Sequence, residues 1–338
     1  MGLRIALTGV HSWPEVQRGA ERYLHELAHA LEDAGHQVRV LSTGATAADV
    51  VLGVPVTRFA PRGERDFGRH CRRELGLARL DVWHATSTGD AAAAVGVARF
   101  RPRLRTVFTD HGFPVRASRE RRGDADLHDR VVAGIGSYVC VSEAAGSWLR
   151  TDYAREADVV PPGVDTAFFT PGGSRATRPT VLYSGALDEE RKGIRLLVQA
   201  VATMPDMVLR LVGPGVPDLS GLPVEHVEVV GLVDREDLLN HYRQAWVTAL
   251  PSTAEAFGMA LTESLACGTP GVARLDGGGP SEILTSTTGV LCEGAPDALA
   301  EALQKAIAAA DAEACRARAE EFDWRRRVVP ALERLYAA

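Results

Sequence analysis

The chain has 338 residues with a formal net charge of -6, and 46% of its residues are hydrophobic. This length predicts about two domains, and the hydrophobic fraction is enough for ordinary globular cores. The acidic balance argues against binding to nucleic acid or anionic membranes, and no apolar run approaches the roughly 18–20 residues that span a bilayer.

The N-terminus and the cysteines indicate a cytoplasmic protein. The first residues, MGLRIALTGV, lack a basic region followed by a cleavage site, so they are typical of a first strand rather than a signal peptide. The five cysteines are scattered and include no C-x-x-C pair. We therefore expect reduced thiols and no zinc site.

The first half of the chain alternates apolar strands with amphipathic helices. Predicted strands occupy Arg4–Thr8, Val38–Leu41, Asp81–His84, Leu104–Thr109 and Ser137–Val141. Between the first two, Ala20–Ala34 has the apolar spacing of a helix, and Gly35 is placed to end it. This opening favours a parallel sheet with helices on both faces. The loop before the helix lacks G-x-G-x-x-G, which argues against a dinucleotide cofactor.

The segment from 116 to 130 is densely charged and contains Asp124 and Asp126 in a D-x-D pattern. A D-x-D that holds a divalent metal normally ends a strand, whereas this stretch has no strand pattern. We therefore reject a metal site here and expect a solvated surface segment. A mobile loop near a binding cleft is the alternative.

A second α/β pattern follows a proline- and glycine-rich stretch that ends in Gly172-Gly173-Ser174. Predicted strands occupy Val181–Ser184, Val208–Val212, Val227–Gly231 and Ala245–Leu250, and predicted helices occupy Met259–Cys267, Ala298–Ala310 and Ala312–Glu321. Gly268 is placed to end the first of these helices in a left-handed conformation.

Two acids, Glu255 and Glu263, flank the start of the helix at Met259–Cys267. The order of strand, acidic loop and helix N-terminus is that of an anion site, because free backbone N–H groups and the positive end of the helix dipole face the loop. Two carboxylates beside such a site can accept hydrogen bonds from sugar hydroxyls. The pattern therefore predicts a ligand that carries phosphate and sugar together. A helix cap and a solvated helix acid are the alternative.

This segment, E-A-F-G-M-A-L-T-E followed by S-L-A-C-G-T-P, resembles the E-x7-E motif of retaining GT-B glycosyltransferases, specifically glycosyltransferase family 4. The resemblance implies that Glu263 holds the nucleotide ribose and that Glu255 holds a hydroxyl of the donor sugar. It also implies that the backbone of Phe257, Gly258 and Met259 approaches the diphosphate and the sugar.

Two further loops resemble the diphosphate-binding parts of this family. In the family's G-R-x(4–5)-K-G loop an arginine and a lysine grip the pyrophosphate; here Lys192 matches the lysine, but Ala186 replaces the arginine. We hypothesise that Arg191 compensates. A glycine pair before the first helix lies close to the diphosphate in the family, and here only Gly19 of that pair remains, so an ordinary helix-start glycine is the alternative.

His111 follows the strand at Leu104–Thr109, where the family has a histidine that contacts the donor sugar. A structural histidine bonded to a turn is the alternative, and His84 or His11 could compete for the role. Val233 lies in the family's base-binding region, where the contacts come mostly from backbone. These contacts therefore do not predict which base the donor carries, and both UDP- and GDP-type donors are retained as expectations.

The resemblance implies the GT-B fold, an α/β architecture of two Rossmann-like, doubly wound parallel-sheet domains facing across a cleft. The predicted N-terminal domain, residues 1–172, would face the acceptor, and residues 173–323 would bind the donor. A terminal helix at 324–338 is expected to cross back onto the N-terminal domain.

The predicted activity is retaining, metal-independent transfer of a sugar from a nucleotide-diphosphate sugar to a hydroxyl of a small-molecule or glycan acceptor. No cofactor and no protein nucleophile are expected. The alternatives are a non-catalytic homologue that binds nucleotide sugars, which the loss of the arginine at Ala186 motivates, and a sugar-nucleotide epimerase. A glycoside hydrolase also uses two carboxylates, but they flank one bond. The abundance of Arg and Ala suggests a high-GC bacterial source and a role in a cell-envelope glycan or a natural product.

Overall fold

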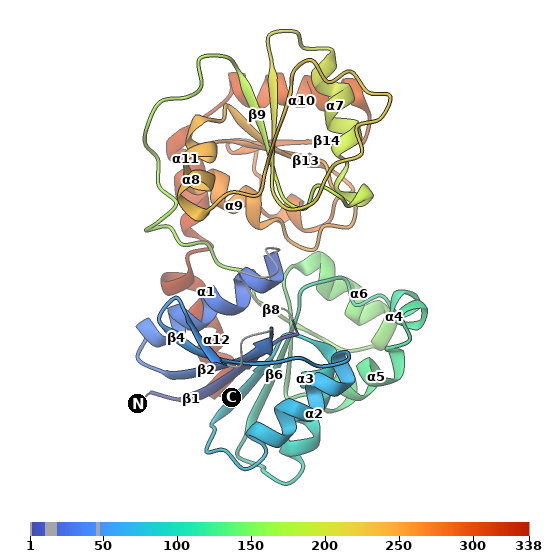
Figure 1. Cartoon of the computed structure of the whole chain (residues 1–338), viewed down its shortest axis with the longest axis vertical. Coiled ribbons are helices and arrows are strands. Elements are labelled where there is room, and N and C mark those ends of the chain that lie inside the picture. Colours follow the sequence, from blue (N-terminus) through green and yellow to red (C-terminus); the bar gives the residue numbers. More distant parts are fainter. Residues whose placement is uncertain (1, 11–18, 45–47, 338) are drawn as a thin grey trace. The chain divides into compact units, whose positions relative to one another are not determined.

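The computed structural model describes residues 2–10, 19–44 and 48–337. Contacts divide the chain into two compact units, Met1–Gly163 with Trp324–Ala338, and Val164–Asp323. Each unit is an α/β domain built on a largely parallel sheet (Figure 1). The predicted α/β fold with two parallel-sheet domains is therefore confirmed.

The chain leaves the first unit at Gly163, earlier than the glycine pair at 172–173 that the sequence suggests as a boundary. The reason lies in the contacts of the intervening segment. The Arg316 guanidinium donates hydrogen bonds of 2.7 Å to the carbonyl oxygens of Thr166 and Phe169. Residues 164–172 are thereby tied to the second unit before the flexible glycines are reached.

The strands described in the first unit are β1 Arg4–Thr8, β2 Gln37–Thr43, β3 Ala48–Val51, β4 Val54–Phe59, β5 Val82–Ala85, β6 Arg105–Asp110, β7 Ser137–Cys140 and β8 Asp158–Val159. Its helices are α1 Gly19–Asp33, α2 Glu64–Leu75, α3 Thr88–Ala98, α4 Arg116–Arg122, α5 Ala125–Gly134, α6 Glu143–Tyr153, the π-helical turn η3 Trp324–Val328 and α12 Val329–Ala337. The strand order is β3-β4-β2-β1-β5-β6-β7-β8, with only β3 antiparallel to its neighbour in the described sheet.

Side-chain alternation along β1 buries both faces of the first sheet. Ile5 and Leu7 pack into a core shared with α1 and α12, whereas Ala6 packs into a second core on the opposite face. The two terminal parts of the unit meet in the first core, and Figure 1 shows α12 (red) beside α1 (blue). The Trp324 indole donates a 3.0 Å hydrogen bond to the Glu26 carboxylate of α1, which fixes where the chain returns to this unit.

The charged segment 116–130 is helical, and most of its charged side chains are exposed to solvent, as its composition predicts. It forms α4 and most of α5, and the Arg119 side chain is buried against Asp110 at the end of β6. Of the D-x-D pair, Asp124 accepts from Arg119, and Asp126 forms an exposed ion pair with Arg65. Arg119 is the exception to this expectation, because a charged side chain can be buried where an oppositely charged group pairs with it.

The second unit contains strands β9 Thr180–Ser184, β10 Val208–Val212, β11 Val227–Gly231, β12 Val247–Leu250, β13 Gly271–Arg274 and β14 Gly289–Cys292. Its helices are η1 Glu190–Lys192, α7 Ile194–Ala202, α8 Arg235–Gln244, α9 Met259–Ala266, η2 Gly279–Glu282, α10 Pro296–Ala308 and α11 Ala312–Glu320. The parallel strands follow the order β11-β10-β9-β12-β13-β14. The order reverses between β9 and β12, and ligands of such sheets bind beyond the carboxyl ends of the strands at this point.

The described helices include none with the length and apolarity needed to cross a lipid bilayer. All five cysteines are free thiols, and Cys292 is the only one that is not buried.

Asp90 is a fully buried carboxyl group in the first turn of α3. One of its oxygens accepts a hydrogen bond from the Thr8 hydroxyl, and the other is buried with no hydrogen-bond partner among the described residues. Burial raises the pKa of Asp90 from 3.8 to about 8. The folded unit therefore keeps a proton on Asp90 at pH values where the unfolded chain has lost it.

We expect Asp90→Asn to remove a pH dependence of stability. Because the folded pKa lies above the unfolded value, the stability that depends on Asp90 is fully present below about pH 4 and is lost as the pH rises toward about 8. The variant cannot titrate, so its unfolding temperature should exceed that of wild type by on the order of 5 °C at pH 8 and by less at pH 5. Thermal unfolding across this range measures the gap, and a gap independent of pH would contradict the assignment.

Candidate functional site

The loops that follow β9 and β12 meet at the point where the strand order of the second unit reverses. Lys192 ends η1 in the first loop, and its ammonium lies 2.7 Å from a carboxylate oxygen of Glu255 in the second loop. The two side chains are only 13% and 16% exposed. The structure thus brings two of the predicted site residues into direct contact.

A glycine allows these two loops to approach one another. Gly193 has φ +71°, and a Cβ built on it would lie 2.4 Å from the carbonyl oxygen of Pro251. On the opposite side, the Thr253 amide donates a 2.8 Å hydrogen bond to the carbonyl of Arg191. Backbone therefore packs on backbone here, and any larger residue at position 193 would push Lys192 away from Glu255.

Glu255 is held in place through its own backbone. Its amide donates a 2.7 Å hydrogen bond to the carbonyl of Gly277, and its carbonyl accepts a 2.9 Å bond from the amide of Gly279. These contacts form an isolated parallel bridge between Glu255 and Gly278. The carboxylate is consequently presented from a fixed backbone position rather than from a free loop.

Helix α9 begins directly after this loop. Gly258 precedes it with φ +112°, so the chain turns sharply into the helix. The Leu261 amide donates a 2.9 Å hydrogen bond to the Gly258 carbonyl, whereas the amides before it lie ahead of the first intrahelical acceptor. Gly268 follows the helix with φ +77°, as the sequence predicts for its end. Phe257 is 4% exposed and its ring packs on Phe322, so this residue faces the site only with its backbone. The backbone from 257 to 259 is therefore free to meet an anion at the positive end of a helix dipole.

Glu263 is not a solvated helix acid. It is 2% exposed in α9, and one carboxylate oxygen accepts a 2.7 Å hydrogen bond from the Tyr242 hydroxyl of α8. A carboxylate is stable when buried to this extent only if it accepts hydrogen bonds. Tyr242 is absent from the predicted site because a tyrosine on the buried face of a helix gives no sequence signal beyond core packing.

Arg191 adds a second cation beside Lys192. One guanidinium nitrogen lies 2.8 Å from Glu189, and another lies 3.9 Å from the Glu255 oxygen that Lys192 contacts. Ala186, in contrast, is buried, and its carbonyl accepts a 2.9 Å hydrogen bond from the Tyr183 hydroxyl. The loop therefore offers its two positive charges from positions 191 and 192, whereas position 186 faces the core.

Val233 and Gly19 lie at the starts of helices. Val233 is half-buried in the turn between β11 and α8, and Asp234 caps that helix by accepting from the Asp237 amide at 2.8 Å. Gly19 is the first residue of α1. The predicted roles of Val233 and Gly19 in donor binding stay predictions.

His111 follows β6 in the first unit. Its ring packs edge-on against Tyr23 at 4.4 Å, and its Nε2 atom is buried with no hydrogen-bond partner in the described part of the chain. Burial lowers the pKa of His111 to about 4, so the ring is neutral near pH 7. It can therefore donate or accept one hydrogen bond without bringing a charge.

Among the competing histidines, His84 does not offer a ring nitrogen that is available as His111 Nε2 is. His84 is fully buried, and its two ring nitrogens lie 2.7 Å from the hydroxyls of Tyr336 and Thr109. Both of its hydrogen-bonding positions are thus occupied within the fold. His11 lies outside the described residues.

Comparison with known proteins identifies the class of protein to which this chain belongs. The model of the Glycosyl transferases group 1 matches residues 165–322, and that of Glycosyltransferase Family 4 matches residues 17–168. Between them the two models cover residues 17–322, and the chain is a glycosyltransferase. The enzyme transfers a sugar from a nucleotide sugar, and the enzyme class predicted from the sequence is confirmed.

Similar proteins cover nearly the whole glycosyltransferase. A D-inositol 3-phosphate glycosyltransferase of Xylanimonas cellulosilytica is 29% identical over 96% of this chain and 94% of its own length. That of Mycobacterium sp. (strain JLS) is 27% identical over 86% of this chain and 79% of its own length. Each resembles this glycosyltransferase along both units.

Solved structures share the fold. Sucrose-phosphate synthase from Thermosynechococcus elongatus has a TM-score of 0.84 at 24% identity, covering 99% of this chain and 98% of the other. Anabaena Alr3699/HepE in complex with UDP and glucose has a TM-score of 0.80 at 19% identity, with the same coverage. These similarities establish the two-domain architecture of the glycosyltransferase.

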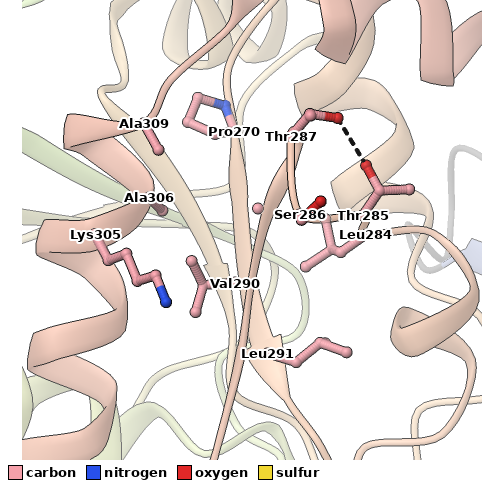
Figure 2. A pocket seen from close by; sticks show the side chains of 11 residues that line it. Pro270, Leu284, Thr285, Ser286, Thr287, Val290, Leu291, Lys305, Ala306 and Ala309 are labelled. Atoms are coloured by element: carbon pink, nitrogen blue, oxygen red, sulfur yellow. Dashed lines mark hydrogen bonds between the residues drawn. The ribbon is translucent and has the colours of Figure 1, made fainter.

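A cavity of about 300 Å³ lies elsewhere in the second unit of the glycosyltransferase, between β14 and α10 (Figure 2). Figure 2 shows the Lys305 side chain extending from α10 toward Val290, and the hydroxyls of Thr285 and Thr287 lie 3.0 Å apart across from it. Its lining falls within residues 270–309 and contains none of the predicted site residues. This cavity is therefore not the predicted donor site.

Among the described residues, no group of three or more His, Cys, Asp or Glu side chains is arranged to hold a metal ion.

Proposed function

We propose that the glycosyltransferase binds the diphosphate of its donor beyond β9 and β12, between the amides at the start of α9 and the cations Lys192 and Arg191. The contact between Lys192 and Glu255 carries this proposal, because it places a cation and a hydrogen-bond acceptor side by side next to a helix N-terminus. Phosphate binds the cation and the amides, and a sugar hydroxyl binds the carboxylate. Glu263 then meets the ribose, deeper in the same helix.

The reaction we infer is a retaining transfer that needs no metal ion. Negative charge grows on the diphosphate as the bond to the sugar breaks, and Lys192, Arg191 and the amides after Gly258 stabilise that charge where a metal would otherwise do so. The acceptor hydroxyl attacks from the side of the leaving group, as the family resemblance implies, and the leaving phosphate takes its proton. His111, neutral and with a free Nε2, contributes a hydrogen bond to the donor sugar.

The donor is inferred to be of UDP- or GDP-type, and the acceptor to be a hydroxyl of a small molecule or glycan. The structure of Alr3699/HepE in complex with UDP supports a UDP-type donor over a GDP-type donor. Val233 would meet the base through its backbone, and Gly19 would approach the diphosphate. The free thiols of the five cysteines fit an enzyme that works in the cytoplasm.

A ligand screen followed by a transfer assay tests these statements. UDP, GDP, ADP and their glucose or mannose conjugates are compared by thermal shift, where a ligand at 100 times its Kd adds ~2.7 kcal/mol of stability. The stabilising donor is then incubated with hydroxyl acceptors in the presence of EDTA, and the anomeric configuration of the product is read by NMR. Retained configuration and full activity in EDTA are expected; inversion or loss of activity in EDTA would overturn the mechanism.

Arg191→Ala should lower the rate of transfer about five- to tenfold, since a second cation stabilises the leaving diphosphate. The matched control is Arg195→Ala. Both arginines have side chains that are 46% exposed, but Arg195 pairs with Asp218 instead of Glu255. Steady-state rates with saturating donor compare the two. Wild-type turnover in Arg191→Ala would refute the hypothesis that Arg191 compensates for the arginine replaced by Ala186.

A further inference from the structure

A tight turn holds the backbone of His111. Asp110, the last residue of β6, lies directly before it, and one carboxylate oxygen of Asp110 accepts a 3.1 Å hydrogen bond from the amide of Gly112. The side chain thus reaches across His111 to the following residue, which is how aspartate closes local turns. The direction in which the His111 ring leaves the strand depends on this carboxylate.

The other carboxylate oxygen of Asp110 is fixed from a different element. It accepts a 2.6 Å hydrogen bond from the Arg119 guanidinium of α4 and a 2.8 Å bond from the Tyr138 hydroxyl of β7. The side chains of Arg119 and Asp110 are only 8% and 7% exposed. This is the strongest class of hydrogen bond in proteins, a charge-assisted bond in a medium of low dielectric.

Arg119 is itself held at three points. Besides Asp110, its guanidinium donates a 2.9 Å hydrogen bond to the Thr88 hydroxyl at the start of α3 and a 3.1 Å bond to Asp124 before α5. A planar guanidinium bound in this way has one position and one orientation. Asp110 is therefore anchored to a rigid point rather than to a flexible surface side chain.

We propose that Arg119 is the positioning residue for His111. By binding one oxygen of Asp110 it keeps the other oxygen on the amide of Gly112, and it offsets the negative charge that would otherwise stand beside the neutral imidazole. This role rests on the proposed function of His111 in the transfer reaction. It acts through backbone geometry, because Arg119 contacts Asp110 and not the imidazole.

A purely structural ion pair would have a different signature. Loss of either partner of a buried pair destabilises a domain, but it leaves the turnover of the folded molecules unchanged. A positioning pair lowers kcat in molecules that are folded and still bind the donor, since a displacement of about 1 Å at a reacting group can cost up to 10²-fold in rate.

The first experiment compares Arg119→Met with Arg116→Met, the same change on the same helix. Arg116 is exposed, and its guanidinium binds Asp129 on the surface. We expect kcat to fall about tenfold in Arg119→Met, with the KM for the donor changed less than about twofold, and no change in Arg116→Met. Folded Arg119→Met with wild-type kcat would overturn the proposal.

The double variant Asp110→Asn/Arg119→Met covers the case in which Arg119→Met does not fold. It removes both charges of the Asp110–Arg119 pair at once, and Asp124, which loses Arg119, keeps Arg122 at 3.8 Å. The amide oxygen of the new side chain can still accept from Gly112. It should fold and recover kcat to within about threefold of wild type, because the turn is restored. A folded double variant with the low kcat of a His111→Ala enzyme would contradict positioning through the turn.

Hydrogen exchange tests the turn without reference to activity. The amide of Gly112 should exchange about tenfold faster in Arg119→Met than in Arg116→Met or wild type, because its acceptor is no longer held. Unchanged exchange would refute the inference even if the enzyme is active. Wild-type kcat in His111→Ala with faster exchange in Arg119→Met would instead refute only the proposed role of His111.

Discussion

Lys192→Met is expected to lower kcat about 10²- to 10³-fold, as loss of one preorganised donor to a developing oxyanion does in other enzymes. Met has nearly the length of Lys without its charge. The Lys192 side chain is 13% exposed and its ammonium lies against Glu255, so it is held in place before the donor arrives. The charge on the diphosphate is larger in the transition state than in the bound donor. The loss should consequently appear mainly in kcat and less in the KM for the donor.

The chain supplies its own control for this experiment. Lys305 is the only other lysine among the 38 Lys and Arg residues of the chain, and it lines the separate cavity beside β14. Lys305→Met removes the same charge from the same unit and should leave kcat unchanged. Lys192→Arg keeps the charge but enlarges the head group, so an intermediate rate is expected. A rate in Lys192→Met equal to that in Lys305→Met would exclude Lys192 from the reaction.

The sequence indicates Lys192 and Glu255 separately, but not the contact between them. Each belongs to a loop whose local structure can be predicted from the sequence, as a strand, a short polar stretch with glycine, and a helix start. Their meeting depends on the sheet order, in which β12 pairs directly with β9 although β10 and β11 intervene in the chain. Local periodicity carries no information on which strands become neighbours, so only the resemblance to a family suggests that the two loops form one site.

In the segment around Arg119, the sequence does not predict the burial of a charged side chain. Its composition predicts solvent exposure, because charged side chains are almost never fully buried without partners. Arg119 has such partners, but they come from β6 and the starts of α3 and α5, and no short sequence pattern indicates them. Helix α2 is missed for a related reason, since only Phe67, Cys71 and Leu75 mark its buried face among eight charged or histidine side chains. Sequence reasoning therefore indicates the two loops of the proposed donor site, but not the contacts that hold Asp110 beside His111.

Glu263→Gln is expected to raise the dissociation constant of UDP about 10- to 100-fold, while kcat at saturating donor changes much less. A hydrogen bond to a charged acceptor contributes about 1.5–3 kcal/mol, and contacts with the ribose are the same in the ground and transition states. The change keeps the shape of the side chain, and the amide oxygen can still accept from the Tyr242 hydroxyl, which binds Glu263 at 2.7 Å. The variant should thus fold normally, in contrast to Glu263→Ala, which leaves a cavity.

Deoxynucleotides separate ribose binding from a structural role of Glu263. If its carboxylate binds a ribose hydroxyl, then 2′-deoxy-UDP or 3′-deoxy-UDP binds wild type as weakly as UDP binds Glu263→Gln, and the substitution costs that analogue little. Tyr242→Phe serves as the control for loss of the supporting bond, and its effect on UDP binding should be smaller, because the carboxylate itself remains. Calorimetric titration of the three nucleotides into the three proteins gives the coupling energy between residue and hydroxyl. A coupling near zero for both deoxynucleotides would leave Glu263 as a buried partner of Tyr242 with no part in donor binding.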